Sequence, residues 1–371
     1  MMNLLYIAYI REDSSAKGFL NKVLGQCYTF RKEFNHVYLY ISRKTEAVLY
    51  KIEEKGPKEI KSFGYSKTFV YKGKSNKIKG YLRYRYFIKC LKRILDSMQI
   101  DVLYYRNSYP TRDLRRLMKY SDSIKTIEIV TYPYEDEWKK TMPYFEYLFM
   151  WKYGQEKVNK LADVIVGISA EKDLKVDEKF ILINNGIQVD SVKVKKQNKK
   201  NYMNLLSIAN VALWHGYDRI IKGLHEYYKT NPEEEIYYHF VGEGPELSNL
   251  KKLTKELSLE KYVIFHGTKT GEELDKVVDE CDIAFGSLGN HRKGLYADSA
   301  LKNREYCARG IPFVIASEDQ DFPETFPFVY RIPKDDTPVD INQVIKWYES
   351  LIKEHPNYSM EMRKYAEQNL S

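Results

Sequence analysis

The stretch that decides the fold is GSLGNHRKGLYADSALKNREYCARGIPFVIA, residues 286–316. It follows the apolar run CDIAF and reads as a long loop with glycines and cations, a helix, and a second short apolar strand. Asp298 or Ser299 can cap the helix, residues 300–308 propagate it, and Gly310 ends it. A strand, a crossover helix and a further strand predict two parallel strands of one sheet.

The same alternation extends in both directions from this stretch. Short apolar strands separated by helix-length segments are expected at residues 4–9, 36–41, 102–105, 126–130, 164–168 and 180–183, and later in LLSIA, IYYHFVG, YVIFHG and IPFVIA. This order predicts an α/β protein built from two Rossmann-like, doubly wound parallel sheets. The unpatterned, cationic KVKKQNKK at residues 193–200 separates them.

We therefore expect a first domain over residues 1–192, a linker over 193–200 and a second domain over 201–350. Residues 351–371 are helical in composition, are interrupted at Pro356, and could return to the first domain. The chain has 371 residues, of which 43% are hydrophobic and 30% charged, a composition that argues against disorder. No apolar run reaches the length of a membrane span, and the N-terminus lacks signal-peptide features.

Cysteine spacing and net charge say less about function than the strand and helix pattern does. Cys27, Cys90, Cys281 and Cys307 lie far apart, which favours buried free thiols in a reducing compartment. Residues 1–200 carry a net charge of +17, whereas residues 201–371 carry −8. The basic half could serve nucleic acid, an anionic membrane or an anionic substrate, and composition does not choose among them.

The helix that starts near Ser299 is a candidate anion site. Its first amides and its dipole favour a negative ligand, and Lys302 adds a full positive charge, so a diphosphate would fit. Glu305 lies one turn further on the same face, where a carboxylate could accept two ribose hydroxyls. The alternative is an ordinary Lys/Glu surface pair on a helix.

A second candidate lies in SIANVALWHGYDRIIKGL, residues 207–224. Asn210 and His215 follow a strand, and Gly216 would let the backbone approach a phosphate that His215 contacts. Arg219 opposes the helix dipole unless an anion offsets it, although pairing with Asp218 or plain exposure would explain it equally well. Further donor-binding candidates after strand ends are Gly242, Glu243, Gly267, Thr268 and Arg292.

The order of NNGI, IAN…WHGYDR, FVGEGPE, FHGTKTGEEL, DIAFGSLG and LKNREYCARGIPFV resembles the C-terminal half of glycosyltransferase family 4, closest to its bacterial capsule and surface-polysaccharide branch. The resemblance covers residues 181–316 well. It implies a GT-B fold of two Rossmann-like domains facing a cleft. It also implies retaining transfer of a hexose or N-acetylhexosamine from a nucleotide diphosphate sugar to a lipid-linked oligosaccharide. From the family we expect the donor to be a UDP-sugar.

The resemblance also assigns site residues, with departures. Glu305 matches the family's ribose-binding acid, but Ala297 stands where a first acid is expected, and the adjacent Asp298 could substitute. The family's phosphate-gripping Arg and Lys align with Asn210 and His215. Lys302, His215 and Asp298 are therefore the expected catalytic residues, with Arg219, Arg292 and Ser299 on the donor side. No metal and no cofactor are expected, since fixed cations and amides would stabilise the leaving diphosphate.

Acceptor-side candidates lie in the first domain. The loop REDSSAKGF offers Ser14, Ser15, Lys17 and Gly18, for which a plain strand-to-helix turn is the alternative. The run EIVTYPYEDE offers Tyr132 and Glu135 where many relatives carry a histidine.

Residues 71–95 carry nine Lys and Arg, interleaved with aromatic residues, and no acid. Such a segment can lie on an anionic membrane. The resemblance favours this reading, because polymerising relatives act on lipid-linked acceptors at the cytoplasmic surface, and it implies a cytoplasmic protein peripheral on the inner face of a bacterial membrane. An RNA surface or a solvated helix has similar composition, but no RNA-binding motif accompanies it, so no nucleic-acid partner is expected. The rival functions are a sugar-nucleotide epimerase or hydrolase of the same shape and a non-enzymatic adaptor for nucleic acid or membrane.

Overall fold

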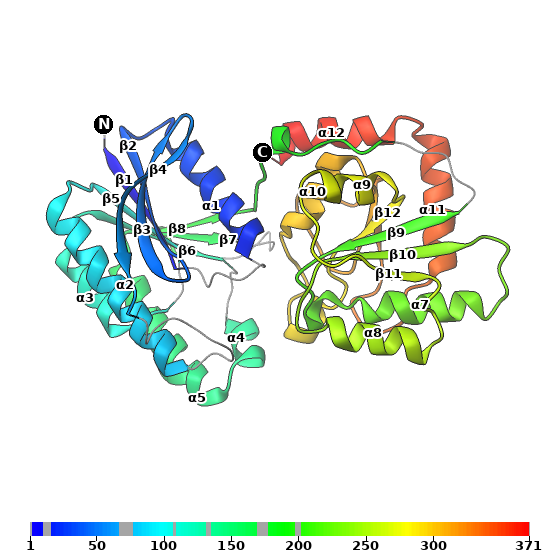
Figure 1. Ribbon diagram of the computed structural model, residues 1–371, viewed down its shortest axis with the longest axis horizontal. Coiled ribbons are helices and arrows are strands. Elements are labelled where there is room, and N and C mark those ends of the chain that lie inside the picture. The colour runs from blue at the N-terminus through cyan, green and yellow to red at the C-terminus, as the bar shows by residue number, and fades with distance from the viewer. Residues whose placement is uncertain are drawn as a thin grey trace. The chain divides into compact units, whose positions relative to one another are not determined.

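The computed structural model describes residues 2–9, 16–66, 77–106, 109–130, 135–168, 177–196 and 202–370. The described residues divide into two compact units, one that comprises those up to residue 183 and one that comprises those from Asn184 onward (Figure 1). Residues 184–196, which were expected to belong partly to the first domain and partly to the linker, group with the second unit. There the Ile187 amide donates to the Leu370 carbonyl (2.9 Å) and the Lys195 amide to the Arg309 carbonyl (2.8 Å).

The first unit contains an eight-stranded sheet with the order β4-β3-β2-β1-β5-β6-β7-β8. Its strands are β1 (Asn3–Ala8), β2 (His36–Ser42), β3 (Glu46–Glu53), β4 (Gly56–Gly64), β5 (Val102–Arg106), β6 (Ile124–Ile129), β7 (Val164–Ile168) and β8 (Phe180–Ile183). The six predicted parallel strands are confirmed. The antiparallel hairpin β3–β4 at one edge was not predicted.

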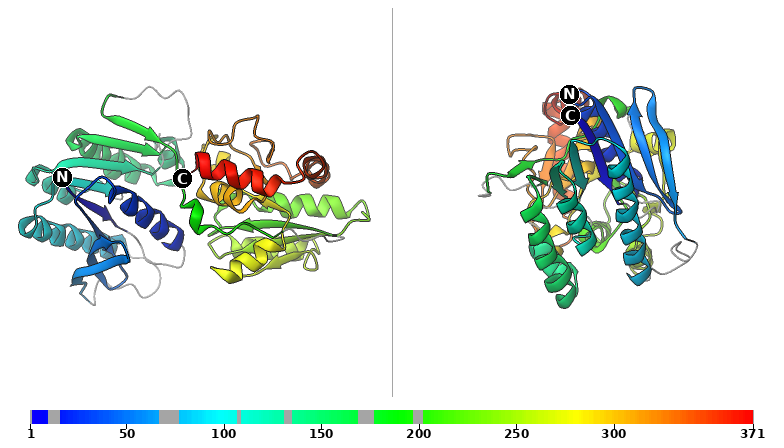
Figure 2. Two further views of the ribbon diagram at one scale, coloured as in Figure 1. Left: turned by 90° about the horizontal axis from the view of Figure 1, so that it is seen from above. Right: turned by 90° about the vertical axis from the view of Figure 1, so that its left-hand side faces the viewer.

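Helices cover both faces of this sheet. The apolar sides of α2 (Lys77–Ser97), α3 (Arg112–Tyr120) and α6 (Tyr153–Leu161) share one core with the sheet, whereas α1 (Ala16–Phe30) packs on the opposite face. Figure 2 shows the three helices side by side on one face. Between β6 and α6 lie α4 (Glu135–Thr141), α5 (Tyr144–Glu146) and the π-helix η2 (Tyr147–Lys152).

The second unit contains a six-stranded, all-parallel sheet with the order β11-β10-β9-β12-β13-β14. Its strands are β9 (Met203–Ile208), β10 (Ile236–Val241), β11 (Val263–Phe265), β12 (Ile283–Phe285), β13 (Phe313–Ile315) and β14 (Val329–Arg331). Every predicted strand is present. The additional strand β14 is three residues long and only partly apolar, which is why its sequence gave no signal.

The helices α7 (Asp218–Tyr228), α8 (Leu247–Glu256) and α11 (Ile341–Glu354) cover one face of the second sheet. The helices α9 (Glu272–Asp279), α10 (Leu301–Arg309) and α12 (Tyr358–Asn369) cover the other. Gly310 ends α10 with a φ of 69°, and α11 and α12 are separate helices on either side of Pro356, as predicted. The four cysteines are buried and free, as predicted.

No helix in the described part of the chain combines the length and apolar character needed to cross a bilayer.

Candidate active site at the carboxyl edge of the second sheet

Loops from neighbouring strands meet at the carboxyl edge of the second sheet, the edge at which open α/β sheets bind ligands. The Gly242 amide after β10 donates to the Gly267 carbonyl after β11 (2.8 Å). The Val211 amide after β9 donates to the Glu243 carbonyl (2.6 Å). Glu243 and Thr268 are exposed here. The predicted donor-side residues of β10 and β11 are thus neighbours at one edge.

The loops after β9 and β12 are joined more tightly. The first contains the short helix η4 (Leu213–His215) and the second contains η5 (Asn290–Lys293). The Leu288 amide donates to the His215 carbonyl (2.8 Å) and the Gly289 amide to the Trp214 carbonyl (3.2 Å). Gly216 has a φ of 63°, and a Cβ there would lie 2.7 Å from the Gly289 nitrogen. Only glycine fits at Gly216, so this close approach fixes the position of His215.

His215 is held as a neutral imidazole. Its side chain is buried, and Nδ1 accepts a hydrogen bond from the Ala212 amide (2.9 Å). That bond leaves the ring proton on Nε2. Burial, with a further contribution from the positive Lys302, lowers the pKa of His215 to about 2. His215 is therefore an uncharged hydrogen-bond donor throughout the physiological pH range.

Lys302 lies in the first turn of α10. Its ammonium donates to the Tyr217 hydroxyl (3.0 Å) and lies 5.5 Å from the centroid of that ring. The side chain keeps some exposure, yet desolvation lowers the pKa of Lys302 from 10.5 to about 7, with the Asp298 carboxylate opposing part of the effect. An ammonium in this condition gains proton affinity when an anion binds beside it.

The start of α10 differs from the predicted cap. The N-cap residue is Ala300, which offers no side-chain hydrogen bond. The Ser299 hydroxyl instead accepts from the Asn185 amide (2.8 Å), and Asp298 Oδ1 accepts from the Ala300 amide (3.1 Å). The prediction that Asp298 or Ser299 caps the helix is therefore wrong. The amides of the first turn of a helix have no carbonyl partner within the helix. Without a capping side chain, those of α10 are suited to donate hydrogen bonds to an anion.

Glu305 lies one turn after Lys302 on α10. Its side chain is 35% exposed, and Oε1 accepts from the Arg309 guanidinium (3.0 Å) rather than from Lys302. Arg309 also pairs with Asp275 of α9 (2.7 Å). Glu305 is thus ionically paired but remains accessible at the helix surface.

Arg219 and Arg292 hold loops in place. The Arg219 side chain is fully buried and donates to the carbonyls of Leu288 (2.5 Å), Thr337 (2.7 Å) and Pro333 (3.0 Å). Neither alternative considered for Arg219, exposure or pairing with Asp218, is found, and its guanidinium donates to carbonyls where a phosphate contact was expected. The arrangement satisfies a buried cation with backbone oxygens.

Arg292, rather than Arg219, forms the ion pair with Asp218. Its two terminal nitrogens lie 2.8 and 3.0 Å from the two Asp218 oxygens, and Nε lies 2.7 Å from Asp336. It also donates to the Leu213 carbonyl (2.9 Å). Arg292 therefore links η5 to η4 and to the first turn of α7, where it positions the loop that carries His215.

A buried ion-pair cluster on α10 was not predicted from the sequence. Arg304 is fully buried and pairs with both oxygens of Asp319 (2.9 and 3.0 Å) and with Asp321. Burial raises the pKa of Asp319 to about 6. These two acids have Asp-x-Asp spacing, and both charges face Arg304. Among the described residues, no group of three or more His, Cys, Asp or Glu side chains could hold a metal ion.

The acceptor-side candidates are only partly covered. Ser14, Ser15 and Tyr132 lie outside the described residues. Lys17 and Gly18 belong to the first turn of α1, and Glu135 is the exposed first residue of α4.

A second buried charged cluster, also unpredicted, lies near the carboxyl ends of β5 and β6. Glu128 is fully buried and accepts from Tyr104 (2.8 Å) and Gln26 (2.8 Å), and it pairs with Arg106 and with Lys22 (3.8 Å). These cations and hydrogen bonds lower the pKa of Glu128 although burial opposes them. The cluster ties α1 to two strands. A lone Glu in the strand IKTIEI was its one sequence signal.

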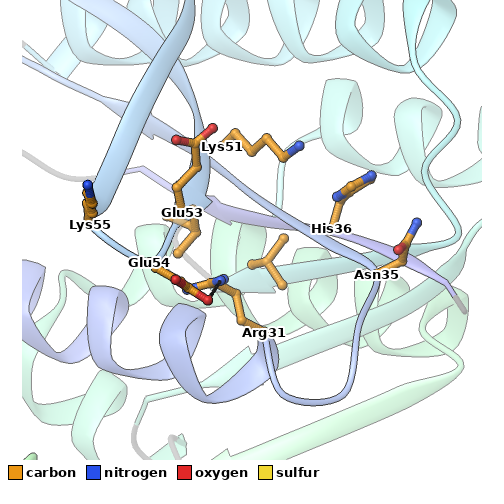
Figure 3. Close-up of a pocket in the computed structure, with 9 residues that line it drawn as sticks. Arg31, Asn35, His36, Lys51, Glu53, Glu54 and Lys55 are labelled. Carbon is orange, nitrogen blue, oxygen red and sulfur yellow. Dashed lines mark ion pairs between the residues drawn. The ribbon is translucent and has the colours of Figure 1, made fainter.

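Two cavities differ in their relation to the strand ends. One of about 530 Å³ adjoins η4 and the start of α7 and includes Gly216, Asp218 and Arg292 in its wall. The other, of about 420 Å³, lies in the first unit at the amino end of β2 and is lined mostly by charged side chains (Figure 3). Arg31 and Glu54 form an ion pair across it (3.8 Å). Because ligands of doubly wound sheets bind at carboxyl ends, the second-unit edge is the stronger candidate site.

Comparison with known proteins gives a match to one family and several similar folds. Residues 188–327 match the family described as glycosyl transferases group 1. The fold is similar to that of sucrose-phosphate synthase from Thermosynechococcus elongatus (TM-score 0.68, 10% identity, covering 100% of this chain and 95% of that one). Anabaena Alr3699/HepE, solved in complex with UDP and glucose, gives a TM-score of 0.62 at 11% identity, covering 100% of this chain and 96% of that one.

A third similar structure is WaaG, a glycosyltransferase involved in lipopolysaccharide biosynthesis (TM-score 0.63, 13% identity, covering 98% of this chain and 95% of that one). No curated protein sequence is recognisably similar to the chain. The predicted fold class, GT-B with two Rossmann-like units, is confirmed. The matched residues fall within the second unit.

Proposed function

We propose that the protein is a retaining glycosyltransferase of family 4, from its capsule and surface-polysaccharide branch. It would move a hexose or N-acetylhexosamine from a nucleotide diphosphate sugar to a lipid-linked oligosaccharide. The observation that carries the proposal is the pairing of a desolvated Lys302 ammonium with the uncapped start of α10, at the carboxyl edge of a group 1 domain. UDP is the proposed nucleotide because the similar Anabaena protein binds it.

The chemical task is to stabilise negative charge on the leaving diphosphate as the glycosidic bond breaks. Lys302 would supply a fixed cation, and the first-turn amides of α10 would supply aligned dipoles. His215 would donate from Nε2 without bringing a second positive charge beside Lys302, since it stays neutral. The proposal includes no metal and no cofactor.

Other residues have supporting roles in this proposal. Asp298 favours the charged form of Lys302 and orders the Ala300 amide. Glu305 would accept the ribose hydroxyls. The exposed Asn210, Glu243 and Thr268 line the same edge of the sheet.

The acceptor and the location belong to the same proposal. The involvement of WaaG in lipopolysaccharide biosynthesis supports a lipid-linked saccharide acceptor. The acceptor would be held by the first unit through Ser14, Ser15, Lys17, Gly18, Tyr132 and Glu135. The protein would work in the cytoplasm, peripheral on the inner membrane face, with the basic residues 71–95 toward anionic lipid.

The ribose role of Glu305 can be tested by calorimetry with UDP and 2′-deoxy-UDP. Hydrogen bonds to a charged group contribute about 1.5–3 kcal/mol, so Glu305→Gln should weaken UDP binding by about 10- to 100-fold and remove the preference for ribose. Glu367→Gln is the matched control, because Glu367 pairs with Arg363 at the same i,i+4 spacing (2.7 Å) on α12. An unchanged ratio of ribo- to deoxynucleotide affinity would contradict the assignment.

Product analysis separates transfer from the rival reactions. A transferase releases UDP in step with glycosylation of a lipid-linked acceptor. Consumption of the UDP-sugar at the same rate without acceptor would indicate an epimerase or hydrolase and would refute the proposal.

A further inference from the structure

A row of aromatic side chains is exposed on the first unit. Tyr144, Phe145 and Phe149 are 67%, 74% and 70% exposed, and Tyr153 is half exposed. They lie on the continuous helical segment formed by α5, η2 and the start of α6. Soluble proteins rarely leave several neighbouring large aromatic side chains uncovered unless they contact a partner. We call these four residues the aromatic ridge.

The helices beside the aromatic ridge are strongly cationic. The helix α6 packs against α3, and α3 packs against α2, so all three belong to one layer (Figure 2). Only two acids, Asp96 and Asp113, occur among the described residues of α2 and α3. The exposed cations of these two helices are Lys79, Arg85, Lys89, Lys92, Arg93, Arg112, Arg116 and Lys119.

The aromatic ridge is anchored near the ligand-binding edge of its own sheet. Trp151 of η2 packs against Tyr109 (ring centroids 5.8 Å apart), and a Cβ on Gly154 would lie 2.9 Å from the Pro110 carbonyl oxygen. Tyr109 and Pro110 follow the carboxyl end of β5 closely in the chain. The C-terminal end of the aromatic ridge therefore lies beside the edge at which this sheet would receive an acceptor.

We infer that this layer is the membrane-contact surface, with the aromatic ridge entering the headgroup region of an anionic bilayer and the α2–α3 cations binding lipid phosphates. Aromatic residues flanked by Lys and Arg suit the polar boundary of a bilayer, and charge complementarity selects an anionic lipid. A second copy of the chain fits less well, because two such faces would bring like charges together. The inference rests on the proposed lipid-linked acceptor and assigns the deepest membrane contact to residues 144–153, beyond the basic segment 71–95.

The first test is sedimentation with vesicles of phosphatidylcholine containing 30% phosphatidylglycerol. Each exposed Phe that enters the boundary between lipid headgroups and acyl chains raises membrane affinity about tenfold. The double variant Phe145→Ser with Phe149→Ser should therefore bind vesicles on the order of 100-fold more weakly. Met360→Ser with Ile352→Ser, which removes two exposed apolar side chains from the second unit, should bind as the wild type does. Equal binding by the two double variants would overturn the inference.

The second test changes charge alone. One Lys or Arg near an anionic surface raises membrane affinity about fivefold. A variant with Lys89, Arg93 and Arg116 all replaced by Gln should therefore bind the vesicles on the order of 100-fold more weakly. Binding should also weaken with salt and vanish on pure phosphatidylcholine. The charge-matched control is a triple Gln variant of the exposed α8 lysines Lys251, Lys252 and Lys255. If both triple variants bind equally, a diffuse positive charge explains the binding and the inference fails.

Hydrogen exchange of the wild type with and without anionic vesicles guards against misfolded variants. Protection should appear in residues 144–153 and in α2 and α3, and protection confined to other elements would overturn the inference. Concentration-dependent dimerisation abolished by Phe145→Ser, or competition by RNA with vesicles, would assign the face to those partners and equally refute it. UDP affinity should be unchanged in the Phe145→Ser with Phe149→Ser variant, so failure here is distinct from failure of the proposed donor site.

Discussion

Replacing Lys302 by Met should stabilise the free protein while weakening its binding of a nucleotide diphosphate. Met fills nearly the same volume without a charge, and it removes the hydrogen bond to Tyr217 (3.0 Å). The stabilisation is expected because the ammonium is desolvated in the folded protein and fully hydrated in the unfolded chain. The loss of binding is expected because this ammonium is the proposed cation for the diphosphate.

The size of the effect follows from the pKa of Lys302. Folding lowers that pKa from 10.5 to about 7. Each tenfold change in proton affinity corresponds to about 1.4 kcal/mol, which sets a ceiling of about 5 kcal/mol on the cost of burying this charge. Partial exposure of the side chain and the lost Tyr217 bond reduce the expected gain in unfolding free energy for Lys302→Met to about 1–2 kcal/mol.

The pH dependence has a definite sign. Because the folded-state pKa lies below the unfolded one, the cost is complete below about pH 7 and disappears above pH 10.5. Urea unfolding of both proteins without ligand should therefore show a stability gap that is largest at pH 6–7 and narrows toward pH 9. A variant that is less stable than the wild type at every pH, or one that binds UDP unchanged, would refute this reasoning.

Three further predictions concern the loops around Lys302. Gly216→Ala should lower the unfolding free energy by about 1–3 kcal/mol, because Gly216 has a positive φ and an added Cβ would collide with the Gly289 backbone. Gly64→Ala should not, because there is open space where its Cβ would be. Arg292→Lys loses the two-point pair with Asp218 and should reduce both thermal stability and UDP affinity, with a less than additive effect when combined with Asp218→Asn. Nitrogen-15 NMR of His215 should show an unprotonated Nδ1 with no titration between pH 5 and 8, and a protonation step in that range would contradict its neutral role.

Apolar runs sufficed to predict the parallel strands, because a strand buried on both faces must be continuously apolar. The edge hairpin β3–β4 escaped because most of β4, GPKEIKSFG, is polar and exposed, which resembles a loop when the sequence is read alone. The helix boundary at Gly310 could be predicted because a left-handed C-cap favours glycine strongly.

Side-chain roles at the site were harder to predict from sequence. The position of Lys302 at a helix start was visible in the local pattern. The use of Arg219 was not, because its acceptors at Leu288 and Thr337 lie 69 and 118 residues away in the sequence. For the same reason, the sequence did not predict that Arg292 rather than Arg219 pairs with Asp218. Contacts between distant loops depend on the register of the whole sheet, which local patterns do not contain.

The most direct test of the central claim is a crystal structure of the protein with UDP. We expect the terminal phosphate to lie about 3 Å from the Lys302 ammonium and from the first amides of α10, with the ribose at Glu305. A diphosphate bound elsewhere, for example in the charged cavity beside Arg31, with the start of α10 uncontacted, would contradict the account.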